Sequence, residues 1–205
     1  MVDTAGNASR PLSVTTGTTG VATQITAGTS HTCALLKDTG GDSDLLGDER
    51  PDLVQCWGDN ARGQLGLGTT EVAVEPKSVH LPDVVQVVAG ADHTCARQST
   101  GAVWCWGSNQ NGQLGLGDTQ DRLVPADVVL PDAVDISAGG DHTCAVLTSG
   151  AVRCWGRNDR GQLGVPVSGV KSLPVSVNGV SGAQRVTAGY AHTCAVVANG
   201  SVRCW

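Results

Sequence analysis

One motif recurs along this chain at an interval near fifty residues, and this repetition constrains the fold more than any other feature. Its most complete copy reads AGGDHTCAVLTSGAVRCWGRNDRGQLG, from residue 138 to residue 164. The motif occurs three times nearly whole and a fourth time cut short, and the first cysteines of the four copies are 62, 49 and 50 residues apart. A period of this length with strand-like contents is typical of a propeller or of another repeat array.

Three of the sets of residues that recur besides the cysteines bear on function. They are the histidines His31, His93, His142 and His192, the tryptophans Trp57, Trp106, Trp155 and Trp205, and the turn residues Gly63, Gln64, Gly112, Gln113, Gly161 and Gln162. An active site is normally built once, from different groups in different roles. The repetition therefore indicates structural roles: a histidine hydrogen bond to a turn or to a neighbouring unit, and tryptophans in the core.

Each unit is expected to contain four short antiparallel strands. In the third copy the β-prone runs are 134–138, 142–147, 151–155 and 173–177, and residues 148–150 form a three-residue hairpin loop with glycine at its left-handed position. The proline of the last run suits an edge strand, where a missing N–H is harmless. Both faces of the hairpin are largely apolar, so we expect neighbouring units to cover them.

The sequence therefore predicts an all-β fold, a β-propeller of four-stranded antiparallel blades with about four blades present. Residues 1–20 form a Thr/Gly/Ser-rich linker or the end of a preceding domain, and the blades span 21–82, 83–131, 132–180 and a truncated 181–205. Because the last copy stops at Trp205, we expect a piece of a longer protein that forms an open arc. Its end blades would expose apolar faces, which favours self-association.

The eight cysteines fall two to a unit, on opposite strands of the same hairpin. Directly opposed residues of an antiparallel pair lie within disulfide range. The predicted bridges are Cys33–Cys56, Cys95–Cys105, Cys144–Cys154 and Cys194–Cys204. They would indicate an oxidising compartment. Two alternatives remain open: buried free thiols, and a metal site in which His142 joins Cys144 and Cys154.

The remaining composition excludes several classes of function. The net charge is −6 and the 13 Lys and Arg residues are scattered, so a nucleic-acid partner is not expected. No apolar run is long enough to span a membrane, and we expect neither a cofactor nor a metal ion. An acidic insertion in the first hairpin, residues 37–52, is expected to be a solvated loop. His80, the one histidine outside the repeat, lies in an expected outer strand, 77–81.

The units resemble the repeats of the regulator of chromosome condensation family. The residues that carry the resemblance in the second copy are Ala89-Gly90, His93-Thr94, Gly101, Val103, Trp106-Gly107, Asn109 and Gly112-Gln113-Leu114-Gly115. The resemblance covers about residues 21–205 and implies a seven-bladed type of propeller, so that the four blades here would form an open part of one. The paired cysteines resemble those of exported bacterial members of the family.

The hypothesis that follows is a non-catalytic binding or structural segment of an exported bacterial protein, secreted or at the cell surface, with a protein or cell-surface ligand. One alternative is a secreted enzyme inhibitor, because a similar propeller inhibits β-lactamase. A further alternative is a nucleotide exchange factor for a small GTPase, as in known members of the family. An enzyme is not expected, because no unrepeated constellation of His, Cys or Ser stands out.

Overall fold

The computed structural model describes residues 20–38, 53–130 and 132–205, and within these ranges every helix or strand assigned is a β-strand. The first sheet holds β1 (Gly20–Ala27), β2 (His31–Asp38), β3 (Leu53–Gly58) and β4 (Ala73–Val79), and the second holds β5 (Val84–Ala89), β6 (His93–Gln98), β7 (Val103–Gly107) and β8 (Arg122–Val128). The third sheet holds β9 (Ala133–Ala138), β10 (His142–Leu147), β11 (Val152–Gly156) and β12 (Lys171–Ser176). The fourth sheet holds β13 (Ala183–Ala188), β14 (Thr193–Val197) and β15 (Val202–Cys204). The linker at 1–19 and most of the acidic insertion, 39–52, lie outside the described residues.

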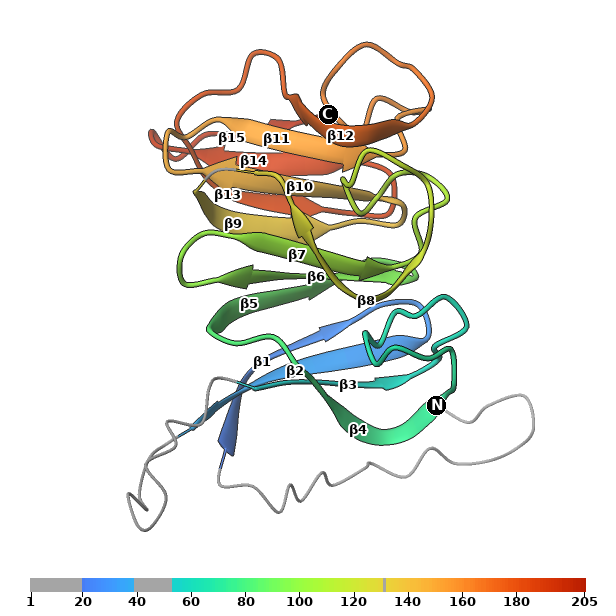
Figure 1. Cartoon of the computed structure of the whole chain (residues 1–205). Helices are drawn as coiled ribbons and strands as arrows, with labels where there is room; N and C mark the ends of the chain where they lie inside the picture. Colours follow the sequence, from blue (N-terminus) through green and yellow to red (C-terminus); the bar gives the residue numbers. More distant parts are fainter. Residues whose placement is uncertain (1–19, 39–52, 131) are drawn as a thin grey trace, which may run out of the picture.

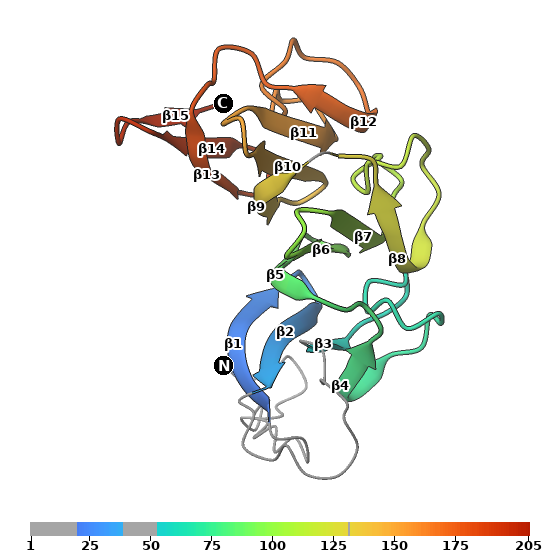
Figure 2. The same cartoon turned by 60° about the vertical axis from the view of Figure 1, so that its left-hand side comes forward.

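Within each sheet the strands follow one another in chain order and pair antiparallel. The sheets stack face to face, with the first and the fourth at opposite ends of the stack (Figures 1 and 2). The predicted fold is therefore confirmed: the described residues form an all-β, open arc of propeller blades. Among the described residues, the main contacts between sheets join blades that are adjacent in the chain, as in other repeat proteins.

The hairpin register of the third blade is the one predicted from the sequence. Cys144 lies opposite Cys154 and Thr143 lies opposite Trp155. Gly150 closes the hairpin with φ +76°, in the left-handed region that glycine adopts without a Cβ clash. All six residues of β10 are buried, which agrees with the expectation that neighbouring blades cover both faces of the hairpin.

The outermost strand of each complete blade carries a proline near its middle. The three prolines are Pro76 in β4, Pro125 in β8 and Pro174 in β12. Each of these strands is the last in its sheet, so the predicted edge position of Pro174 is confirmed. A proline has no N–H to offer to an added strand, and these edges therefore resist pairing with another chain.

The hydrophobic core is divided into three clusters, one at each blade interface. The first cluster, for example, packs Leu35 and Leu65 of the first blade against Val87 and Trp106 of the second. The other two clusters join the second blade to the third and the third to the fourth. The stack is thus stabilised mainly between blades, since a single four-stranded sheet has no second layer within itself to cover its apolar faces.

A line of polar contacts also joins the innermost strands. The side-chain oxygen of Gln24 accepts a hydrogen bond from the N–H of Val87 at 3.0 Å, and Asp135 accepts one from Val186 at 2.8 Å. Gln86 accepts in the same way from the N–H of the third blade's inner strand. The sequence does not mark these contacts as a repeated feature, because this position holds glutamine in the first two blades, Asp135 in the third and Arg185 in the fourth.

Candidate binding face

The recurring histidine, threonine, glutamine and tryptophan form one contact between adjacent blades. His93 Nε2–H donates to Thr143 Oγ1 at 2.9 Å. That hydroxyl donates to the backbone carbonyl of Gln113 at 2.8 Å, and Trp155 Nε1–H donates to the same carbonyl at 2.9 Å. The same contacts join His31, Thr94, Gln64 and Trp106 in the first interface, and His142, Thr193, Gln162 and Trp205 in the third. We call this set the interblade bridge.

The interblade bridge fixes the protonation of its histidine. A threonine hydroxyl has one proton, and in Thr143 this proton goes to the carbonyl of Gln113. The hydroxyl must then accept from imidazole Nε2–H, and Nδ1 of His93 is left as a buried acceptor without a hydrogen-bond partner among the described residues. Burial, followed by the neighbouring histidines, lowers the pKa of His93 to about 3, and burial lowers the pKa of His31 and His142 to about 4.

The bridge also explains the last glycine of the Gly-Gln-Leu-Gly turn. Gly115 has φ +76°, and a Cβ built on it would lie 2.8 Å from Nε1 of Trp155 on the next blade. Trp106 and Trp155 are fully buried against such turns. At the ends of the stack Trp57 and Trp205 are half-buried and His192 is exposed.

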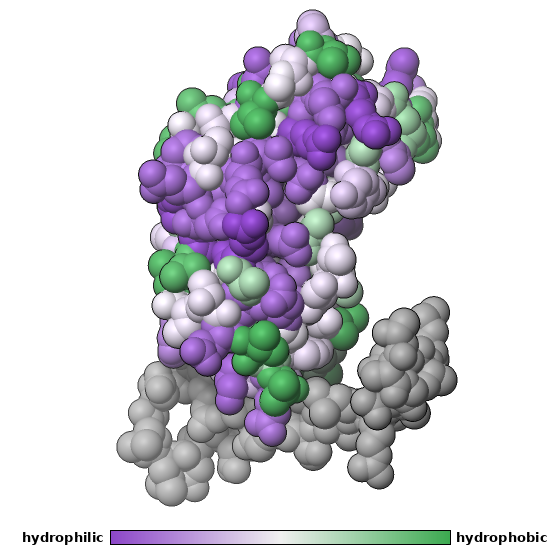
Figure 3. Space-filling model, turned by 90° about the vertical axis from the view of Figure 1, so that its right-hand side faces the viewer, coloured by the Kyte–Doolittle hydropathy of each residue, from purple (hydrophilic) through white to green (hydrophobic). Residues whose placement is uncertain are grey.

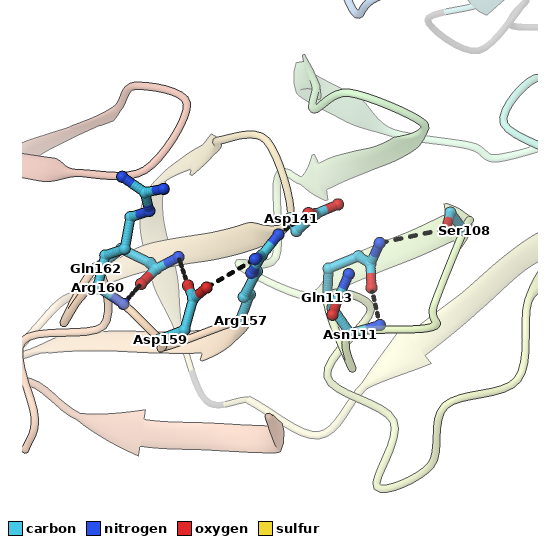
Figure 4. Close-up of polar contacts among 8 residues, drawn as sticks. All are labelled: Ser108, Asn111, Gln113, Asp141, Arg157, Asp159, Arg160 and Gln162. Atoms are coloured by element: carbon cyan, nitrogen blue, oxygen red, sulfur yellow. Dashed lines mark hydrogen bonds and ion pairs between the residues drawn. The ribbon is translucent and has the colours of Figure 1, made fainter. Parts of the chain in front are cut away.

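The turn itself belongs to a long loop that two buried amides hold in shape. In the second blade, Asn109 Oδ1 accepts from the N–H of Leu114 at 3.0 Å, and Gln113 Oε1 accepts from the N–H of Asn111 at 2.8 Å. Gln113 Nε2 also donates to the hydroxyl of Ser108 (Figure 4). Asn60 with Gln64, and Asn158 with Gln162, make the same amide-to-backbone contacts in the first and third blades. The three loops therefore share one rigid frame.

The tips of these loops point outward and differ in sequence. We define the loop face as the side of the stack formed by residues 59–72, 108–121 and 157–170, together with the turns at 28–30, 90–92, 139–141 and 189–192. Its tip pairs are Ala61–Arg62, Gln110–Asn111 and Asp159–Arg160. Figure 3 looks onto this side of the molecule and shows a hydrophilic band through its middle. A common frame with variable tips is the arrangement by which loops on a rigid scaffold bind partners.

Charges of both signs meet on the loop face. Arg157 contacts Asp159 at 2.6 Å and Asp141 at 3.4 Å (Figure 4). The hydrogen bond from Arg157 holds the pKa of Asp159 below its usual value. On the neighbouring blade, partial burial raises the pKa of Asp92, and the nearby carboxylates of Asp59 and Asp141 raise it further. The proximity of Asp59, Asp92 and Asp141 was not predicted from the sequence, because these three residues come from different blades.

The structure pairs all eight cysteines within their own blades. The bridges are Cys33–Cys56, Cys95–Cys105, Cys144–Cys154 and Cys194–Cys204, with a Cα–Cα distance of 4.1 Å in each. The free-thiol alternative disagrees with this arrangement. So does a metal site at His142, Cys144 and Cys154, because both sulfurs are bonded to each other. Within the described ranges, no group of three or more His, Cys, Asp or Glu side chains is placed to hold a metal ion.

The described part of the chain contains no helix long and apolar enough to cross a membrane.

The loop face offers hydrogen-bond donors, acceptors and paired charges on a fixed framework. Such a polar surface with charges of both signs suits recognition of another protein, where charge complementarity gives specificity.

Family models of the regulator of chromosome condensation (RCC1) repeat match most of the chain. One matches residues 53–97, 100–146 and 149–196, and a second matches 22–64, 84–113 and 133–162. The ultraviolet-B receptor UVR8 of Arabidopsis thaliana is 41% identical over 64 residues, which make up 30% of this chain and 14% of the receptor.

Solved propellers have the same fold. Prp20p of Saccharomyces cerevisiae, described with its binding to Gsp1p and histones, superposes with a TM-score of 0.77 at 26% identity, over 94% of this chain and 47% of that one. The yeast RCC1 (Prp20) structure with Kap60 gives a TM-score of 0.76 at 26% identity, over 93% and 44%. Human WBSCR16 gives 0.74 at 23% identity, over 91% and 47%. The chain thus spans less than half the length of each of these relatives.

Proposed function

Because this chain belongs to the regulator of chromosome condensation family, whose repeat matches residues 53–97, 100–146 and 149–196, we propose that it is a non-catalytic, protein-binding segment of an exported bacterial protein. The loop face is its binding surface. The observation that carries the proposal is the combination of buried Asn and Gln frames with outward tips that differ from blade to blade. A propeller used only as a spacer has no need of such variation.

The proposed location rests on the disulfides. Each blade contains one, and the described residues include no free cysteine. Disulfides of this kind persist in oxidising compartments and are rare where thioredoxin and glutathione keep thiols reduced. A secreted or cell-surface protein is the setting that fits these bonds.

The test compares two double variants that each add two exposed carboxylates. One is Ala61→Glu with Gln110→Glu, on the loop face, and the other is Thr100→Glu with Ser149→Glu, in the hairpin loops at the opposite end of the blades. The tagged chain is used to capture proteins from culture supernatant and cell-surface extract. We expect a partner that the loop-face variant loses and the hairpin variant retains. Equal retention by both variants would contradict the proposal.

The nature of the captured partner also separates the other functions considered for this fold. Inhibition of a captured enzyme by stoichiometric chain would indicate a secreted inhibitor. Accelerated nucleotide release from a captured GTPase would indicate an exchange factor. In both cases the loop face would remain the binding surface. Turnover of a small molecule by the chain alone would contradict a non-catalytic role.

A further inference from the structure

A cleft of about 570 Å³ lies between the outer parts of the first and second blades. Its walls come from the end of β4 and the link to β5, from the turn after Leu65, from the end of β6, and from β7 and β8. The lining residues are Gly66, Leu67, Ser78, His80, Leu81, Pro82, Gln98, Trp104, Val124 and Pro125. The sequence predicts His80 within an outer strand; this is wrong, because β4 ends at Val79 and His80 is an exposed residue of the link.

Trp104 lines the cleft and occupies a position of the repeat at which the other blades have no aromatic residue. The equivalent position, directly before the second cysteine, is Gln55 in the first blade, Arg153 in the third and Arg203 in the fourth. The other blades form their hairpins without an aromatic residue there, so the fold does not require one. A single large aromatic side chain in a surface cleft is characteristic of a ligand contact.

Hydrogen bonds fix the orientation of this indole. Trp104 Nε1–H donates to Gln98 Oε1 at 3.0 Å, and Gln98 Nε2 donates to the carbonyl of Pro82 at 2.8 Å. Leu67 and Trp104 both pack against the core of the first interface. Since the indole N–H is already occupied, the group that Trp104 can offer to a ligand is the face of its ring.

The polar side chains at the cleft carry no fixed charge, and each can both donate and accept hydrogen bonds. Ser78 contributes a hydroxyl, His80 an imidazole and Gln98 an amide, and among the described residues no Asp, Glu, Lys or Arg lines the cleft. A sugar ring presents C–H groups on one face and hydroxyls around its edge. Its C–H hydrogens carry a partial positive charge, which matches the negative face of an indole, and its hydroxyls match groups that both donate and accept.

We propose that this cleft binds a neutral hexose unit of a glycan, stacked on Trp104. A proline-rich peptide fits less well, because it presents mainly carbonyl acceptors and the Trp104 N–H is already used. The cleft shares Gly66 and Leu67 with one loop of the loop face but includes none of the tip residues, and it is argued from Trp104, so it does not rest on the function proposed above. The chain would then bind a polysaccharide at the outer strands of the first and second blades, next to the loop face and away from its tips.

The experiment is isothermal titration of the disulfide-bonded 205-residue chain. The ligands are the hexasaccharides of β-1,4-N-acetylglucosamine, β-1,4-glucose, α-1,4-glucose and β-1,4-mannose, with an uncharged proline-rich decapeptide for comparison. Trp104→Arg introduces the residue that the third and fourth blades have at this position. Trp104→Phe keeps an aromatic face, and Arg153→Gln alters the equivalent position of the next blade.

We expect at least one hexasaccharide to bind, at least about a tenfold loss of affinity in Trp104→Arg, and a change of no more than about threefold in Trp104→Phe and Arg153→Gln. The melting temperature of each variant checks that the blade remains folded. The proposal is overturned if none of the four saccharides binds, if the peptide alone binds, or if Trp104→Arg binds as well as the unmodified chain. Loss of binding in Trp104→Phe equal to that in Trp104→Arg would also contradict stacking on the ring.

Discussion

Replacing Thr143 by valine removes the hydroxyl at the centre of an interblade bridge while keeping the shape of the side chain. His93 Nε2–H loses its acceptor in a fully buried site, and the Gln113 carbonyl keeps only the donor from Trp155. A buried donor left unsatisfied costs about 1–3 kcal/mol, and a lost hydrogen bond costs about 1 kcal/mol. We therefore expect Thr143→Val to lower the free energy of unfolding by about 2–4 kcal/mol.

The assay is urea unfolding followed by tryptophan fluorescence, with the melting temperature as a second measure. For a chain of this size the expected loss corresponds to about 5–15 °C. Thr143→Ser keeps the hydroxyl and removes a methyl group, so it should cost only about 1 kcal/mol. Thr148→Val makes the same replacement at an exposed loop position and should change stability by less than about 0.5 kcal/mol. A Thr143→Val variant as stable as the Thr148→Val control would refute the role given to the bridge.

Three further predictions concern the whole chain. Because the pKa values of His31, His93 and His142 are lowered to about 4, 3 and 4, the unfolded state binds more protons below about pH 6.5. The free energy of unfolding, measured by urea titration, should therefore fall from pH 6.5 to pH 5 with a slope of up to about 4 kcal/mol per pH unit; a flat profile would show that the imidazoles are accessible. Thiol titration of denatured, unreduced protein from an oxidising host should find close to no free thiol, since every cysteine is paired, and a titre near eight per chain would contradict the bridges. Because Ile25 on β1 is 69% exposed and Val202 on β15 is 61% exposed, sedimentation should show self-association of the 205-residue chain that rises with concentration, and a concentration-independent monomer would be the opposite result.

The blade could be predicted from the sequence because its determinants are local. The pairing of Cys144 with Cys154 follows from a short hairpin loop centred on Ser149, and the four strands follow from short β-prone runs separated by glycine. Strand pairing within such a unit depends on neighbours that are close along the chain. The repetition then extends one correct hairpin to all the blades.

The contacts between blades could not be predicted in the same way. His93 and Thr143 are both visible as recurring residues, but their partnership joins two copies of the motif, and periodicity alone does not show which residue of one copy meets which residue of the next. The hydrogen bond from the N–H of Val87 to Gln24 recurs at Gln86 in the second interface, but Asp135 takes the place of the glutamine in the third. The cleft at Trp104 combines β4, β7 and β8 of two sheets, so only the departure of Trp104 from the repeat could have marked it in the sequence.

The most direct test of the binding account is site-specific photo-crosslinking from the two ends of the blades. A benzophenone side chain is placed at Gln110, on the loop face, or at Ser149, in a hairpin loop at the other end, both of which are exposed. The chain is then irradiated in cell-surface extract. The account predicts a discrete crosslinked partner from position 110 and none from position 149. Crosslinking of the same partner from position 149 alone would contradict it.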